Sequence, residues 1–217
     1  MTVDEKLNIL DKLDELDELT DEHFLVIKQY VSDDDEFVRS RCAALLVNYS
    51  NNESMDLLLT LMKDEDSFVR TEAYDSLAIF NNKTVEQSLH EAIKTETDDL
   101  ARGYAILSWG DVISGLHCNT KENINFIKQQ KSEEKVSSCI LHCCYALYIN
   151  GQKEFFPEII SFLGDDDYHV RCATLSTLNE IIDINNQEQI KNSIINLLET
   201  EQSLAVRDSA IKLLNSI

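Results

Sequence analysis

Thiols and an imidazole gather on one short segment of this chain. Within residues 139–144 the segment contains Cys139, His142, Cys143 and Cys144. A helix would place several of these side chains on one face. Such a group could bind a metal ion, or could pair a thiol nucleophile with a histidine base. A zinc site, however, normally draws on two separated ligand pairs, and adjacent helical residues diverge by about 100°. We therefore expect core packing here, with no metal and no other cofactor.

Arginines recur at a steady spacing, each behind an acidic turn and most behind a valine. They are Arg39, Arg70, Arg102, Arg171 and Arg207. Consecutive members are 31 to 36 residues apart, except for one gap of 69 residues, where we place a copy at Val136-Ser137 that lacks the arginine. Each arginine could fork to an acidic side chain of its own or the neighbouring turn, while an aspartate caps the following helix. This period predicts stacked helical hairpins.

The composition favours such a stack over other classes. One proline and five glycines in 217 residues leave little material for hairpin turns, and strand-like alternation is absent. At 43% apolar, the chain can bury a continuous core. The sequence predicts an all-α solenoid of about six helical hairpins, with residues 20–217 forming one elongated domain.

Residues 1–19 form a separate amphipathic segment. Leu7, Leu10, Leu13 and Leu16 recur every three residues among acidic side chains. We expect a helix that caps the open end of the stack with a polar outer face, and a partner-binding arm is the alternative. The segment lacks the basic start and apolar run of a secretion signal, and no stretch approaches the ~18 apolar residues of a membrane span. A cytoplasmic location follows as the expectation.

Three acidic segments that lead into Ala- and Leu-bearing helices carry a family resemblance. Residues 33–39, 64–70 and 165–171 resemble HEAT repeats, and are most similar to the short bacterial kind of the phycobilin-lyase-like group. The resemblance covers about residues 20–217. It implies a right-handed superhelix whose second helices line a groove that grips a partner, and it says little about activity.

On that template, positions three, six or seven, and ten residues after the valine face the groove. Arg41 has this register in the first repeat. The groove residues expected to contact a partner are Glu72, Asp75, Ser76, Tyr104, Leu107, Asp111, His142 and Glu180. Carboxylates mixed with Tyr and Leu suit a protein partner that has basic and apolar anchors.

The net charge of −21 narrows the class of partner. Such an acidic chain repels phosphate backbones, so we expect no nucleic acid, but rather a basic protein. Without a long apolar stretch, no membrane is expected as a partner either. Small acidic HEAT-like proteins resemble immunity proteins that block a basic toxin, often a nuclease, and we predict this non-enzymatic role. A general scaffold is the alternative. A lyase-type enzyme, in which Asp75 or Asp111 would contact a tetrapyrrole, comes third.

Overall fold

The computed structural model describes residues 1–217, and its regular structure is entirely helical. It contains thirteen α-helices, two short 3-10 helices and no strand. The helices form two compact units, Met1–Cys118 and Asn119–Ile217. The all-α class is confirmed, and consecutive helices pair into six hairpins after α1, the number that the arginine spacing predicts.

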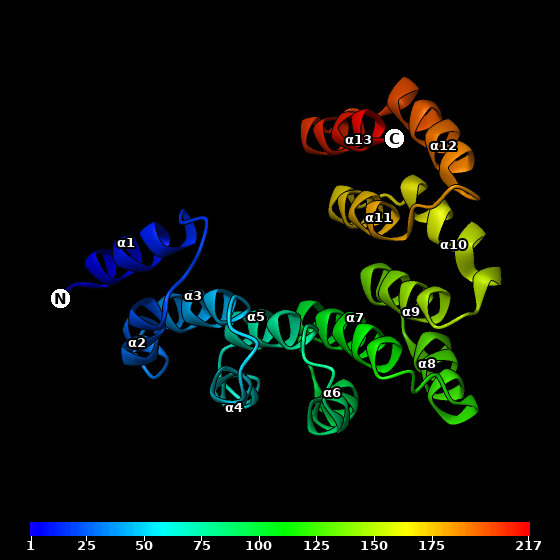
Figure 1. Cartoon of the computed structure of the whole chain (residues 1–217). Coiled ribbons are helices and arrows are strands. Elements are labelled where there is room, and N and C mark those ends of the chain that lie inside the picture. The colour runs from blue at the N-terminus through cyan, green and yellow to red at the C-terminus, as the bar shows by residue number, and fades with distance from the viewer. The chain divides into compact units, whose positions relative to one another are not determined.

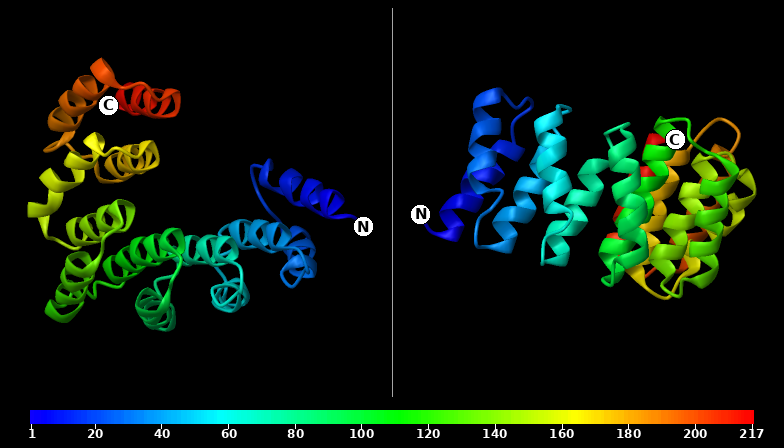
Figure 2. Two further views of the ribbon diagram at one scale, coloured as in Figure 1. Left: turned by 180° about the vertical axis from the view of Figure 1, so that it is seen from behind. Right: turned by 90° about the horizontal axis from the view of Figure 1, so that it is seen from below.

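The first unit contains α1 and three hairpins. Its helices are α1 (Val3–Asp14), α2 (Asp21–Tyr30), α3 (Glu36–Leu46), α4 (Asn52–Leu61), α5 (Ser67–Leu77), α6 (Lys83–Thr95) and α7 (Asp99–Gly115). The second helices of the hairpins, α3, α5 and α7, pack side by side in one layer (Figure 1). The first helices, α2, α4 and α6, form the other layer and follow one another in sequence order when seen from below (Figure 2).

The second unit contains the remaining three hairpins. Its helices are α8 (Lys121–Glu133), α9 (Ser137–Ile149), α10 (Phe156–Ser161), α11 (Tyr168–Ile181), α12 (Gln187–Thr200) and α13 (Leu204–Ser216). The second helices α9, α11 and α13 contact one another in that order. In the middle hairpin, α10 is only six residues long and lies between the 3-10 helices η1 (Lys153–Phe155) and η2 (Phe162–Gly164).

Most second helices begin at an acidic turn because a carboxylate caps their first turn. The Asp35 carboxylate accepts hydrogen bonds from the backbone N–H groups of Phe37 and Val38, at 3.0 and 3.2 Å. The residues that cap α5, α7 and α11 with their side chains are Asp66, Asp98 and Asp167. Such a cap satisfies otherwise unpaired donors and contributes about 1 kcal/mol. The acidic turns therefore set where these helices start.

Three of the five recurring arginines form a ladder of forked ion pairs that joins neighbouring turns as predicted, whereas Arg207 donates to the backbone carbonyls of Leu198 and Glu201. Arg39 donates from Nε and Nη2 to the two carboxylate oxygens of Asp64 in the following turn, at 2.7 and 2.8 Å. The matching pairs are Arg70 with Glu96 and Arg171 with Glu201. Each of these guanidinium groups also donates from Nη1 to two backbone carbonyls of its own turn. The ladder thus ties a repeat to the next one, with glutamate as the acceptor at two of the three rungs.

The fourth repeat follows a different register from the one predicted. In the repeats that have an arginine, the first acidic residue of the turn precedes it by six positions, as Asp64 precedes Arg70. The carboxylate of Asp64 also accepts a hydrogen bond from the backbone N–H two residues later. Glu134 makes the equivalent hydrogen bond to the N–H of Val136, which identifies Glu134 as the turn residue of the fourth repeat.

This assignment moves the fourth repeat by three residues. Val136 is the N-cap of α9, and the fully buried Cys139 takes the core position that valine has in other repeats. Ile140, rather than Ser137, stands where an arginine would be. The Val136-Ser137 alignment was wrong because the repeat lacks the arginine that marks the register.

α1 packs against α3. Leu10 is fully buried and Leu13 nearly so. Lys6 donates to the Asp33 carboxylate at 2.5 Å, so α1 supplies the first acidic turn with a cation, as an arginine does for later turns. None of the helices is long and apolar enough to cross a membrane.

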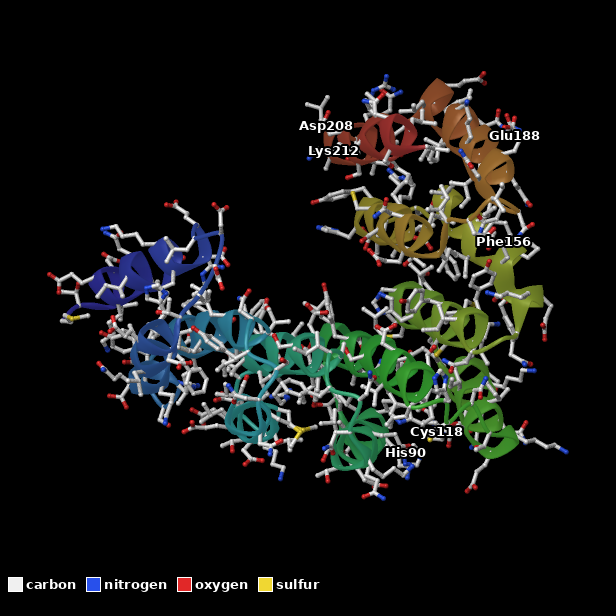
Figure 3. All side chains as sticks on the ribbon, in the orientation of Figure 1. His90, Cys118, Phe156, Glu188, Asp208 and Lys212 are labelled. Atoms are coloured by element: carbon white, nitrogen blue, oxygen red, sulfur yellow. The ribbon has the colours of Figure 1, made fainter.

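Trp109 connects the two layers of the first unit in their interior. Its side chain is fully buried on α7, and its indole N–H donates to the buried Glu86 carboxylate of α6 at 3.3 Å. His90, labelled in Figure 3, also lies on α6 and stacks on the indole with ring centroids 5.3 Å apart. The first helices therefore hold the second helices from one side, which leaves the other side of α3, α5 and α7 to present side chains.

Candidate partner-binding surface

The side of α3, α5 and α7 that faces away from α2, α4 and α6 presents one set of equivalent positions; we call it the second-helix surface. Three residues after the core Val or Ala, these positions hold Arg41, Glu72 and Tyr104. All three side chains are half-buried. Asp75, one turn after Glu72 on α5, is exposed. Residues three or four apart share a helix face, so the surface is a small grid that runs across three helices.

Glu72 and Asp75 are carboxylates that are not engaged in an ion pair. Neither forms an ion pair or accepts a side-chain hydrogen bond. Burial raises the pKa of Glu72, the negative charge of Asp75 raises it further, and Arg41 lowers it less strongly. Desolvation by the surrounding helices also raises the pKa of Asp75, although part of its side chain reaches the solvent. Ionising both groups in the free protein is therefore unfavourable, and a cation from outside would relieve this cost.

Tyr104 completes the cluster from α7. Its pKa is raised by burial and then by the charges of Asp75 and Glu72, so the phenol lies within electrostatic range of both carboxylates. A tyrosine next to acidic side chains is a common companion of basic side chains at interfaces. The structure thus brings together three of the predicted residues, Glu72, Asp75 and Tyr104.

Arg41 is held by α1 rather than by these carboxylates. Its Nε donates to Asp11 at 2.8 Å and its Nη2 donates to Asp14 at 3.0 Å. A hollow of about 500 Å³ lies beside it, lined by Leu7, Asp11, Phe37, Ser40, Arg41, Ala44 and Glu72. The second-helix surface is therefore indented where α1, α3 and α5 meet.

Sequence reasoning missed an apolar row on this surface. Phe37, Phe68 and Leu100 are 59%, 57% and 48% exposed. Each lies in the first turn of its helix, directly before the core Val or Ala and four residues before Arg41, Glu72 or Tyr104. The same aromatic or aliphatic residue type at one register position in three successive repeats is the signal that could have revealed the row.

The other predicted groove residues lie elsewhere or are covered. Ser76 is only 3% exposed, because its hydroxyl donates to the backbone carbonyl of Ala43 on the neighbouring helix. It was wrongly assigned to the surface. Leu107 and Asp111 continue along α7 and are half-buried.

Two predicted residues belong to the second unit. His142 lies on α9 and is only 8% exposed, so it is not the accessible groove residue that we expected. Glu180 lies on α11 and is exposed. Neither therefore belongs to the second-helix surface of the first unit.

The thiol-rich segment of α9 packs in the core. Cys139, Cys143 and Cys144 are fully buried. Burial raises the pKa of Cys144 to about 12 and that of Cys143 further, so both stay protonated at neutral pH. No group of three or more His, Cys, Asp or Glu side chains in residues 1–217 is arranged to hold a metal ion.

A larger hollow of about 740 Å³ lies between α4, α5 and α6. The residues that line it are Met62, Lys63, Asp64, Arg70, Tyr74, Thr84, Gln87, Ser88, Glu91, Ala92, Thr95, Glu96 and Thr97. Most are polar or charged, and Arg70, Asp64 and Glu96 are already engaged in the ladder. Asp75 and Asp111, the carboxylates expected to contact a tetrapyrrole, do not line it.

The acidic charge is concentrated in the first unit. Residues 1–118 contain 26 Asp and Glu against 10 Lys and Arg, a net charge of −16. Residues 119–217 contain 14 against 9, a net charge of −5. The unit that carries the uncompensated carboxylates and the apolar row is therefore also the one that attracts cations most strongly.

Comparisons with known proteins agree with the repeat architecture. Residues 25–109 match the family model of HEAT repeats. The chain is similar to a solved structure of the complex of CpcE and CpcF of phycocyanin lyase from Nostoc sp. PCC7120, with a TM-score of 0.67. The match covers 98% of this chain and 88% of that chain at 17% sequence identity, so it shows the fold alone. No curated protein matches the chain in sequence.

Proposed function

We propose that this HEAT-repeat protein is a non-enzymatic binding module that captures a basic protein on the second-helix surface of its first unit. The observation that carries the proposal is the pair Glu72 and Asp75, two neighbouring carboxylates that form no ion pair and lie within electrostatic range of Tyr104. Carboxylates of the ladder have internal partners and serve the fold. Glu72 and Asp75 do not, so their ionisation is stabilised most by a Lys or Arg from outside.

Neutralisation of a basic toxin domain is the finer function that we propose. Carboxylates on this surface would occupy the positions at which a nuclease cleft binds phosphates, and the protein would block the cleft by steric and electrostatic occlusion. The net charge of −16 in the first unit supports this mechanism. A scaffold with several weaker partners would use the same surface without a single tight complex.

Capture of the tagged protein from its native host tests the proposal. We compare wild type with the variant Glu72→Gln/Asp75→Asn, at low and at high salt, and identify retained proteins by mass spectrometry. A single basic protein should be retained by wild type, and the variant should lose it, because each lost charge pair weakens binding roughly tenfold or more. The thermal stability of the variant should not fall, since both carboxylates are costly to ionise in the free protein.

The matched control is Glu22→Gln/Asp56→Asn. These exposed residues lie on α2 and α4, in the opposite layer, and their replacement removes the same two charges. The control should retain the partner. Equal retention by all three proteins would reject the second-helix surface as the binding site, and capture of several proteins in substoichiometric amounts would favour the scaffold.

A lyase subunit is the second candidate, favoured by the structural similarity to the phycocyanin lyase complex over 98% of the chain. This function requires that the protein bind a tetrapyrrole pigment. Incubation with a bilin followed by gel filtration tests it: visible absorbance that elutes with the protein supports the lyase role. A colourless protein peak, together with a captured basic partner, supports the binding module.

A further inference from the structure

The exposed apolar side chains of the second-helix surface form a row that crosses three helices. Phe37, Phe68 and Leu100 have equivalent positions on α3, α5 and α7, so the row runs across the helices rather than along one of them. Single exposed apolar residues are ordinary on a protein surface. A row of three in the same register, one per repeat, is a line of exposed apolar side chains that a partner can cover.

A second row runs parallel to this line, one helical turn away. It consists of Arg41, Glu72 and Tyr104, each four residues after a member of the apolar row. Residues separated in this way are about 5–6 Å apart. An α-helix with its side chains is about 10–12 Å wide and can cover both rows at once, whereas an extended strand, about 5 Å from its neighbours in a sheet, is matched to only one row.

The hollow beside Arg41 fits the same kind of partner. Leu7, Phe37 and Ala44 provide apolar walls, and Glu72 lies at the wall nearest to α5. A long basic side chain buries an apolar stem while keeping its charged end near an acceptor. A Lys or Arg entering this hollow would place its stem against Phe37 and its cation near Glu72.

We propose that the second-helix surface binds one amphipathic α-helix of the partner, which crosses α3, α5 and α7 with apolar side chains on Phe37, Phe68 and Leu100 and basic side chains beside Glu72 and Asp75. The inference rests on the proposed function and specifies the partner. Packed helices lie 8–10 Å apart, close to the ~10.5 Å covered by seven residues of an α-helix. The partner helix therefore repeats its apolar and basic contacts about every seven residues.

A synthetic peptide tests the proposal. The peptide has about 20 residues, or roughly 30 Å of helix, with Leu and Lys arranged to form adjacent apolar and basic faces. One comparison peptide has the same composition in an order that mixes the faces, and another has a central proline that breaks the helix. Fluorescence anisotropy should show that the amphipathic peptide binds at least about tenfold more tightly than either. Circular dichroism should show helix gained on binding.

Protein variants connect this binding to the apolar row. Phe37→Ser/Phe68→Ser should weaken binding of the amphipathic peptide by about tenfold or more. The control Ile184→Ser/Leu204→Ser removes side chains that are 91% and 77% exposed in the second unit, and should bind as wild type does. Equal affinity for the three peptides, or unchanged binding by the Phe37→Ser/Phe68→Ser variant, would overturn the helix proposal.

Capture from the host separates failure of this inference from failure of the proposed function. If Glu72→Gln/Asp75→Asn loses the natural partner while Phe37→Ser/Phe68→Ser retains it, the surface binds a basic protein, but not through a helix on the apolar row. If both variants retain the partner, the proposed function fails as well.

Discussion

Carboxylates with the same chemistry have two different environments in this molecule. Asp64, Glu96 and Glu201 each receive a forked pair of hydrogen bonds from an arginine, and their pKa values are lowered. Glu72 and Asp75 receive none, and their pKa values are raised. The folded protein favours the ionised form of the first group of carboxylates. It disfavours the ionised form of Glu72 and Asp75. The paired acids thus stabilise the fold in their ionised form, whereas Glu72 and Asp75 do not.

The Arg70–Glu96 pair should make stability sensitive to acid. Burial raises the pKa of Glu96, but hydrogen bonds from Arg70, from the Asp98 backbone N–H and from the Tyr74 hydroxyl outweigh it and lower the pKa to about 2. Since the folded pKa lies below the usual 4.5, the contribution is present above pH ~4.5 and is lost as the pH falls toward 2. Glu96→Gln should cost about 3–5 kcal/mol at neutral pH, because Arg70 loses its counter-charge.

Urea denaturation between acid and neutral pH measures this effect. The Glu96→Gln variant should show a smaller loss of unfolding free energy than wild type as the pH falls below ~4.5. Glu53→Gln is the control, because it removes an exposed carboxylate that pairs with Lys28, and it should cost no more than about 1 kcal/mol. Parallel profiles for wild type and Glu96→Gln would show that the ladder does not carry the acid sensitivity.

At the scale of elements, repeated local chemistry made most of the fold predictable. An acidic turn followed six residues later by an arginine provides a helix cap and an ion pair, and it also marks the register of the repeat. The hairpins around Arg39, Arg70 and Arg171 could therefore be located from the spacing of these residues. The fourth hairpin lacks the arginine, and its register was misplaced by three residues. The correct register depends on the backbone hydrogen bonds of Glu134, which no residue spacing reveals.

The candidate surface was harder to predict because the second helices are covered on several sides. α5 contacts α3, α7 and α4, so only a narrow stripe remains accessible. Positions three and six after the core valine lie on this stripe, as Glu72 and Asp75 show. The position seven after it faces the neighbouring helix, where Ser76 bonds to Ala43. The exposure of Phe37 and Phe68 was missed because an aromatic residue next to a core valine is expected to be buried with it.

The role of α1 can be tested at its contact with α3. If α1 is a structural cap, Leu10→Ala should cost about 2–5 kcal/mol, because Leu10 is fully buried. Hydrogen exchange of the backbone amides of α1 and α3 should then become faster. Leu25→Ala is the matched control, since Leu25 is 57% exposed on α2 and its truncation should cost little. Equal effects of the two substitutions would show that α1 is a detachable arm, the alternative interpretation of residues 1–19.

For the molecule as a whole, the negative charge is unevenly distributed between the two units. Residues 1–118 carry −16 of the total −21, although they are only slightly more than half of the chain. Several acids of this unit are neutralised by Lys6, Arg39, Arg41 and Arg70. The remaining negative charge is the basis of our proposal that a basic protein, rather than nucleic acid, approaches the unit that carries Glu72 and Asp75.

This negative charge predicts a specific kinetic signature for partner binding. Raising the salt concentration from about 10 mM to 1 M shortens the Debye length from roughly 30 Å to 3 Å, so the association rate should fall by about ten- to a thousandfold. Glu22→Gln/Asp56→Asn should slow association slightly and leave dissociation unchanged, because these residues contribute to the field without touching the partner. Glu72→Gln/Asp75→Asn should instead speed dissociation, since it removes the contacts themselves. Stopped-flow mixing with the captured basic protein measures both rates, and an association rate independent of salt would show that the acidic charge does not guide the partner to this surface.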